Sequence, residues 1–517
     1  MMKLNKYKNS YIVIIFFTII HLIFAGLWSV NFEFTFSEAA KYFNNFDIRY
    51  IDFYISNNAN TLAFPIIVGA IHKVIPFDTL VIAKIISASS YLIMGVAIIN
   101  FHKKLNFTSE AAYSLIFIYL NPIVWMLGFR GTPDLFSCSL ALLASSLLIQ
   151  QKNLFNLKRF FYLILFSSAI IIKPITAIFA ILIFYFKFLD NNLKFNFYYI
   201  RSSVVEILII ITPIILYLVF FMQFFNNENI INYAEIINEK FGRGFYNNFF
   251  LYLAFTFLSI SILLFSKKKY IFIFIFLSSI ILLLTFYVDI SFDKNHHGEM
   301  NFGFLSTFIP NNFYYVYMIF LGVLMLFIFI ALCVFIFRKS DIDFNKAFPF
   351  LLCFIFCIAI LSLFRPVQRY LILILPISIL FVSQFRKKNI FLSISYICFF
   401  SLINILIINN QITNSLISKE VYNYLAEKKI LSDTYPGELN AHIRHLFVDE
   451  GKIAPPTFQN EDRHYIIQAI RNNSTIKSFS VSLIPFIKKT LHVNKCDIAR
   501  IDPKLHGGII CKQQLMN

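Results

Sequence analysis

The sequence has few charged residues for its length. Aspartate, glutamate, lysine and arginine together make up 14% of the 517 residues, whereas 58% are hydrophobic. Apolar runs repeatedly approach the roughly 20 residues that cross a bilayer. This composition excludes a soluble fold and predicts an all-α polytopic membrane protein. A basic module interleaved with aromatic residues is also lacking, so the net charge of +18 indicates orientation in the membrane and contact with membrane lipid, and no nucleic-acid partner.

Cysteine is sparse and scattered, with seven residues in the chain. Cys496 and Cys511 lie in the polar C-terminal tail, and whether they form one disulfide depends on that tail being extracytoplasmic. The other five stand singly in apolar runs, which favours packing over metal ligation: Cys138, Cys333, Cys353, Cys357 and Cys398.

The N-terminus lacks a small-x-small cleavage site. Three lysines precede an apolar run over 11–30, which is typical of an uncleaved signal anchor with a cytoplasmic N-terminus. Lysine and arginine then cluster at every second gap between apolar runs, and such basic loops stay in the cytoplasm. The alternation predicts about 13 crossings of a bacterial plasma membrane. An odd number leaves a transmembrane domain over 1–409 and a small extracytoplasmic domain of mixed α and β structure over 410–517.

Two segments depart from simple crossings. The stretch 61–75 is short and contains a proline, so we expect a helix that lies in the membrane interface. The stretch 160–186 is interrupted by Lys173 and Pro174, which predicts two half-length helices that meet near the outer surface. The run 111–128, in contrast, predicts a simple crossing.

Carboxylates gather in the outward loops. The first outward loop contains Glu38, Asp47 and Asp52, and chemistry that deprotonates a hydroxyl at a membrane surface needs such a positioned base. Asp134 follows Pro133 at the start of an expected crossing, where the helix dipole favours an acid. Both features also have a structural interpretation, because solvated loops carry acids and aspartate suits a helix N-terminus.

Basic residues stand at the outward ends of otherwise apolar spans. Cations at membrane depth are usually held by a partner, and a phosphate is a natural partner for arginine because guanidinium offers planar paired donors. Snorkelling toward the headgroups is the alternative interpretation. The candidates are Lys84, Arg130, Lys173, Arg365 and Arg369.

No complete set of metal ligands is visible. The loop 289–299 contains His296 and His297, but adjacent histidines point apart and no third ligand follows at a specific spacing. The sequence therefore neither indicates nor excludes a divalent metal, and no cofactor is expected.

The order of these features resembles the GT-C superfamily of integral-membrane glycosyltransferases, which use polyprenyl-phosphate-linked sugars. The resemblance covers about the first 400 residues and is nearest to the group of protein O-mannosyltransferases and aminoarabinose transferases, with weaker similarity to dolichol-phosphate-glucose glucosyltransferases. It lies in the outward stretch 37–42, the proline-containing stretch 61–76, the basic opening of the next span, the Lys173 break and the late pair Arg369 and Tyr370. Ser37 departs from the family motif, where many relatives have aspartate.

The resemblance implies transfer of a sugar, with inversion, from a polyprenyl-phosphate donor to a hydroxyl of a glycan, lipid-linked or protein acceptor. It implies that Arg369 binds the donor phosphate, with help from the other four outward cations. For the base it favours Glu38, then Asp47, then Asp52, with Asp134 as a supporting carboxylate. Two other functions stay open: a transporter or flippase of lipid-linked sugars, although no internal repeat is visible, and a catalytically silent assembly protein, consistent with Ser37.

Overall fold

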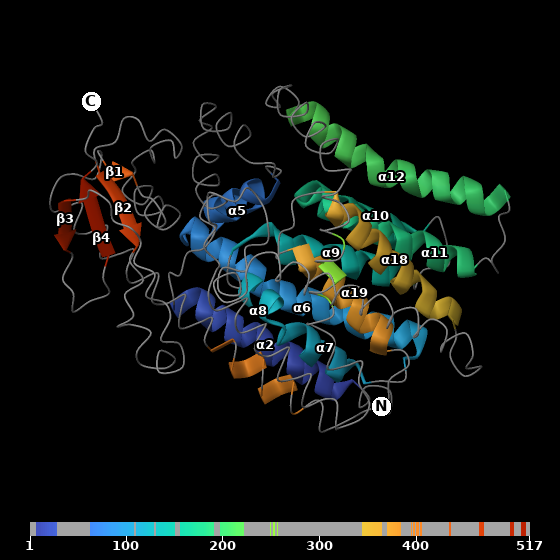
Figure 1. The fold of residues 1–517 in the computed structure, drawn as a ribbon. Helices are drawn as coiled ribbons and strands as arrows, with labels where there is room; N and C mark the ends of the chain where they lie inside the picture. The colour runs from blue at the N-terminus through green and yellow to red at the C-terminus, as the bar shows by residue number, and fades with distance from the viewer. Residues whose placement is uncertain are drawn as a thin grey trace.

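Helices form the described part of the chain before residue 410 in the computed structural model of this protein (Figure 1). Two of them are long and apolar enough to cross a membrane: α6 (Thr79–Leu105) and the Tyr199–Val219 part of α12 (Phe197–Phe221). The structure describes residues 7–27, 63–107, 110–128, 131–149, 156–190, 197–221, 344–363 and 370–383, isolated positions in 249–256 and 394–405, and the strands of the tail.

The first described helices agree with the expected crossings. Helix α2 (Lys8–Leu27) matches the N-terminal run, and the stretch expected at the interface forms α5 (Ala63–Val74) with Pro65 in its first turn. The Asp78 side chain then caps α6 by accepting a hydrogen bond from the Leu80 amide at 2.7 Å. Helix α6 is central in the bundle, because 72% of its most apolar stretch is buried. In α12 only 17% of the most apolar stretch is buried.

The span expected over 111–128 is not one continuous helix. The structure divides it into α7 (Ala111–Tyr119) and α8 (Pro122–Leu127). A proline opens α8, and proline has no amide hydrogen to continue the ladder of α7. The Asn121 side chain caps the new helix by accepting a hydrogen bond from the Ile123 amide at 3.1 Å.

Side chains from late in the chain bind carbonyl groups at this break. The Tyr396 hydroxyl donates to the Phe117 carbonyl at 2.8 Å, and Asn404 Nδ2 donates to the Leu120 carbonyl at 3.0 Å. Both partners are buried. A bilayer offers no water to such groups, so these bonds make the interruption tolerable.

The chain after α9 (Pro133–Leu148) forms a helical hairpin, which confirms the predicted break. Helix α10 (Leu157–Ile172) ends at Lys173, whose backbone is extended with φ −148° and ψ 100°. A 3-10 turn, η1 (Pro174–Phe179), leads into α11 (Ala180–Asp190).

Contacts with α12 show that α11 returns beside α10. Glu206 of α12 binds Arg159 near the start of α10 and Lys187 near the end of α11, with Arg159 Nε to Oε1 at 2.7 Å and Lys187 Nζ to Oε2 at 3.0 Å. The two ends of the hairpin therefore meet, and Lys173 lies at its tip.

Helices α6 and α9 run in the same direction. Ser87 Oγ donates to the Thr132 carbonyl at 3.3 Å near their starts, and Asn100 Nδ2 donates to Ser146 Oγ at 3.5 Å near their ends. The loop that opens α9 is thereby held against the first turns of α6.

Basic clusters from different gaps in the sequence lie at one end of the helical part. Lys103, at the end of α6, donates to the Tyr11 hydroxyl at 3.5 Å, and Arg159 donates to the carbonyl of Leu148 at the end of α9. We call this end, marked by Lys103, Arg159 and Lys187, the basic end. The opposite end, where α9 begins, is the Asp134 end.

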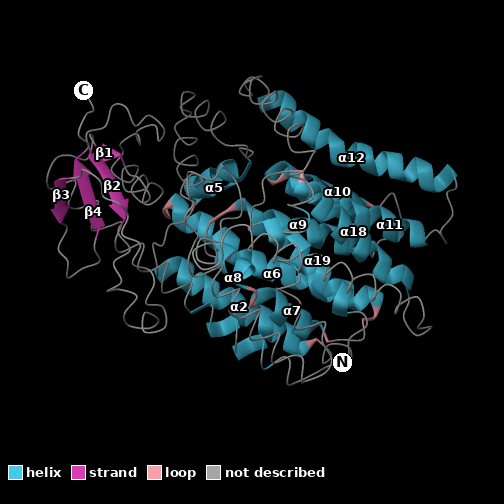
Figure 2. Ribbon diagram, in the orientation of Figure 1, coloured by secondary structure: helices cyan, strands magenta, loops and turns pink. Residues whose placement is uncertain are grey.

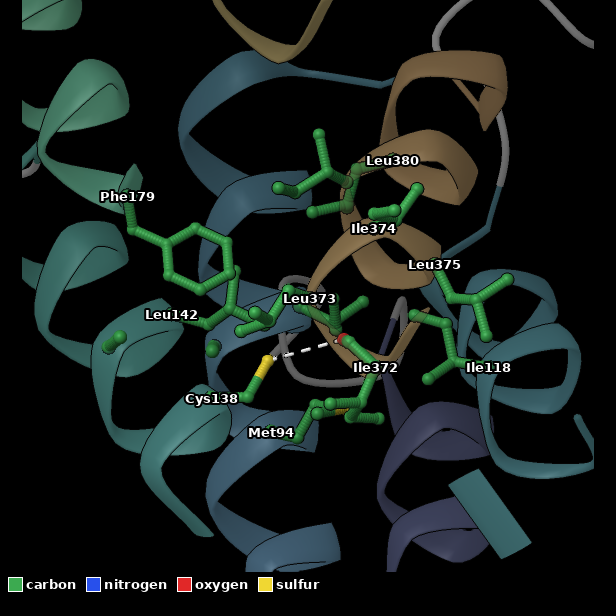
Figure 3. Packing of buried hydrophobic residues seen from close by; sticks show 14 of the residues in the cluster. Met94, Ile118, Cys138, Leu142, Phe179, Ile372, Leu373, Ile374, Leu375 and Leu380 are labelled. Atoms are coloured by element: carbon green, nitrogen blue, oxygen red, sulfur yellow. Dashed lines mark hydrogen bonds between the residues drawn. The ribbon is translucent and has the colours of Figure 1, made fainter. Parts of the chain in front are cut away.

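A fully buried helix crosses the core. Every residue of α19 (Leu371–Ser383) is buried, and α18 (Phe344–Ser362) packs beside it. Cys138 of α9 donates from Sγ to the Ile372 carbonyl at 3.4 Å. Around this contact Figure 3 shows apolar side chains from α6, α7, α9, η1 and α19: Met94, Ile118, Leu142, Phe179, Leu373, Ile374, Leu375 and Leu380.

Strands occur in the tail, as Figure 2 shows in magenta. They form one sheet of order β1-β2-β4-β3, with β1 and β2 parallel and the other pairs antiparallel. Figure 1 draws this sheet beyond the Asp134 end. The sequence also has a helix-like stretch over 418–429 and a strand-sized apolar stretch over 477–484, and both lie outside the described residues. Cys496 lies outside them too, so the disulfide with Cys511 of β4 stays open. The strands are β1 (Thr434–Tyr435), β2 (Tyr465–Ala469), β3 (Asp497–Arg500) and β4 (Gly508–Lys512).

Candidate functional site

Asp134 and Lys173 form a buried ion pair at the Asp134 end. Lys173 Nζ lies 3.1 Å from Asp134 Oδ1, and the side chains are 9% and 2% exposed. The pair joins the tip of the hairpin to the first turn of α9. A buried charge without a partner is strongly destabilising, so each residue depends on a counter-charge at this position.

Local sequence explains why Asp134 lies there. Pro133 opens α9 and Thr132 precedes it with an extended backbone, which places Asp134 in the first turn of a 16-residue helix. The positive end of the helix dipole favours a carboxylate at that position. The buried Thr132 hydroxyl makes no hydrogen bond within the described residues, so a polar group remains available beside the helix N-terminus.

The hairpin tip is fixed by its own backbone. The Lys173 amide donates to the Ala169 carbonyl at 2.9 Å, and the Lys173 carbonyl accepts from the Thr176 hydroxyl at 2.8 Å. Because both backbone groups are bound, the lysine side chain projects from a defined position.

Tyr370 brings the last helix to the same place. Lys173 Nζ lies over its ring, 5.1 Å from the centroid, which is cation–π geometry. Tyr370 directly precedes α19 and follows Arg369 in the sequence. Elements from three distant parts of the chain, α9, the hairpin and α19, thus converge on the Lys173 ammonium.

Lys84 adds a second buried cation nearby. It is 1% exposed in the second turn of α6, where the Asp78 carboxylate attracts it electrostatically. Gly131, with φ +69°, packs so closely on α6 that an added Cβ would lie 3.2 Å from the Ala83 Cβ and 3.4 Å from the Lys84 amide nitrogen. The loop that leads to Asp134 therefore rests on the backbone of Lys84.

This arrangement suits an oxyanion. Two ammonium groups, one helix N-terminus and a buried hydroxyl offer hydrogen-bond donors and positive potential. It does not suit general-base chemistry by Asp134, since the Lys173 ammonium already binds its Oδ1. The supporting role expected of Asp134 stays a prediction.

Three of the nine predicted site residues are described, and all three lie at the Asp134 end: Lys84, Asp134 and Lys173. The structure pairs two of them directly. The loop 289–299 is also undescribed, and within the described residues no group of three His, Cys, Asp or Glu side chains could hold a metal ion. The predicted site residues outside the described part are Glu38, Asp47, Asp52, Arg130, Arg365 and Arg369.

Sequence reasoning assigned no role to Tyr370 or Glu206. Tyr370 had a signal, because it follows a predicted phosphate ligand and begins an apolar span. Glu206 was also detectable as a lone acid within the apolar α12. An isolated charge in a membrane span is usually paired with an opposite charge, and Arg159 and Lys187 pair with Glu206.

Comparisons with known protein families, with curated proteins and with solved structures found no match.

Proposed function

We propose that the protein is an integral-membrane glycosyltransferase that takes its sugar from a polyprenyl-phosphate donor at the extracytoplasmic surface. The observation that carries the proposal is the convergence of buried Lys173, Asp134 and the Tyr370 ring at the end of the helices opposite the basic clusters. A lipid-linked phosphate approaching from the bilayer would meet the Lys173 ammonium beside apolar helices.

Orientation supports the extracytoplasmic assignment. Loops rich in lysine and arginine remain in the cytoplasm, so the basic end faces inward and the Asp134 end faces outward. Large apolar side chains on α2 and α12 are exposed, as expected of surfaces that contact lipid. We retain about 13 crossings and an extracytoplasmic tail domain as part of the proposal.

The proposed reaction is a single displacement. The acceptor oxygen attacks the anomeric carbon while a carboxylate of the first outward loop, Glu38 by preference, takes the hydroxyl proton. The bond from the anomeric carbon to the phosphate oxygen breaks, and the polyprenyl phosphate leaves as an anion. Lys173 and Lys84 would stabilise the charge that grows on the leaving phosphate, with Arg369, the residue before Tyr370, as the expected further donor.

The test uses full-length protein in lipid with a panel of radiolabelled polyprenyl-phosphate sugars and simple hydroxyl acceptors. We expect cleavage of a donor by the wild-type protein and loss of cleavage in Glu38→Gln and Lys173→Met. Lys187→Met is the matched control, because it removes a partly buried, ion-paired lysine from the other end of the same hairpin. That variant should retain turnover.

Other outcomes would contradict the proposal. Movement of the labelled sugar between leaflets without bond cleavage would favour a transporter. Absence of both cleavage and movement across the panel would favour a catalytically silent protein. Full activity in Glu38→Gln, at unchanged folded yield, would reject Glu38 as the base and direct attention to Asp47 and Asp52.

A further inference from the structure

We propose that Asp134 is a displaceable internal counter-ion, which occupies Lys173 until a lipid phosphate arrives and then limits how tightly that phosphate is retained. The inference rests on the proposed function, because it concerns the same phosphate site. It adds a role in product release that the ion pair itself suggests.

The geometry of the pair supports exchange of one anion for another. Lys173 Nζ is buried and lies 3.1 Å from Asp134 Oδ1, so the ammonium already has an oxygen anion as its ligand. An ammonium group carries three donors and forms no rigid fork, so it can share its hydrogen bonds between a carboxylate and a phosphate oxygen. The carboxylate oxygen thus lies where a phosphate oxygen could bind the ammonium group.

Tyr370 keeps the cation in position during the exchange. Its ring faces Lys173 Nζ at 5.1 Å, and the attraction of the ring for the cation does not depend on which anion is bound. The backbone bonds of Lys173 to Ala169 and Thr176 hold the hairpin tip in the same way. The ammonium can therefore change partner without movement of the helices.

The negative charge of Asp134, which stays beside the bound phosphate after the exchange, explains why the lipid phosphate product is released. The donor phosphate is a diester with one negative charge, whereas the leaving lipid phosphate is a monoester that carries close to two at neutral pH. Repulsion by Asp134 consequently acts more strongly on the product than on the donor. Removal of this carboxylate should tighten product binding and slow turnover without raising the KM for the donor.

The binding test needs no sugar. Dissociation constants of farnesyl monophosphate are measured by calorimetry with the full-length protein in phosphatidylcholine nanodiscs. We expect Asp134→Asn to bind about tenfold more tightly than the wild type and Lys173→Met to bind about tenfold more weakly. Lys187→Met, at the basic end, should match the wild type. Unchanged or weaker binding in folded Asp134→Asn would overturn the counter-ion role.

A double variant keeps the test decisive if Asp134→Asn fails to fold. Lys173→Met leaves a carboxylate that repels phosphate, so Asp134→Asn combined with Lys173→Met should bind more tightly than Lys173→Met alone. Equal affinities of these two proteins would overturn the proposal.

Two further arms separate the possible failures. Inorganic phosphate should bind far more weakly than farnesyl phosphate, and equal binding would overturn the lipid assignment. In turnover assays Asp134→Asn should show stronger inhibition by product. Failure of sugar transfer in the wild type, with the expected binding pattern intact, would overturn the proposed function and leave the counter-ion inference standing.

Discussion

Arg159 Nε donates to Glu206 Oε1 at 2.7 Å, and this bond ties α10 to the lipid-facing helix α12. The other carboxylate oxygen lies 3.0 Å from Lys187 Nζ, so one acid holds both ends of the hairpin. At the far tip Lys173 is bound to Asp134. The hairpin that carries Lys173 to the candidate site is thus anchored by ion pairs at its base and at its tip.

Glu206→Gln should destabilise the protein by about 3 kcal/mol, because buried Arg159 and partly buried Lys187 lose their shared counter-charge. The free energy of unfolding in detergent, measured by denaturant titration, checks this. Asp190→Asn is the control: Asp190 is exposed at the last residue of α11, so its loss should cost little. Equal losses in the free energy of unfolding for the two variants would show that the ion pairs of Glu206 do not stabilise the protein.

Tyr396→Phe tests the break between α7 and α8. The substitution removes the donor for the Phe117 carbonyl and should cost about 1 kcal/mol. Tyr162→Phe is a suitable comparison, since Tyr162 packs on the same core and makes no hydrogen bond within the described residues. Its stability should be unchanged, and a matching loss in both variants would argue against the interhelical bond.

Local signals predicted much of the helical part. Apolar runs located α2, α6 and α12, and the proline after Lys173 located the hairpin tip, because missing amide donors and membrane thickness act on contiguous residues. The break at Asn121 was missed although a proline follows it. Its carbonyl partners come from Tyr396 and Asn404, 279 and 284 positions away from the carbonyls they bind, and such contacts leave no local pattern.

The candidate site was predicted as a set of residues but not as a set of pairs. Lys173 and Asp134 were each identified by charge at the end of a span, and Lys173 was assigned to phosphate and Asp134 to support. Nothing in their separate surroundings indicates that they bind each other, because the pairing depends on how the hairpin packs against α9. The contact with Tyr370 depends on packing in the same way.

Gly131→Ala tests the loop that leads to Asp134. The φ of +69° disfavours alanine by about 1 to 2 kcal/mol, and the added Cβ would lie 3.2 Å from the Ala83 Cβ. Gly131→Asn introduces the same Cβ but tolerates a left-handed backbone better. We expect Gly131→Ala to lower thermal stability and farnesyl phosphate affinity more than Gly131→Asn. The reverse order would mean that the contact with α6, and not the backbone conformation, controls this loop.

The orientation of the two ends can be tested by cysteine labelling in intact cells. Lys73 is exposed near the end of α5, on the Asp134 side of α6, and Lys104 lies in the last turn of α6 at the basic end. In a background with Cys333, Cys398, Cys496 and Cys511 replaced by serine, a membrane-impermeant maleimide should label Lys73→Cys directly. It should label Lys104→Cys only after the membrane is permeabilised, because the positive charges of the basic end keep it in the cytoplasm. Labelling of Lys104→Cys alone in intact cells would place Lys173 and Asp134 in the cytoplasmic half, where no extracytoplasmic donor could reach them.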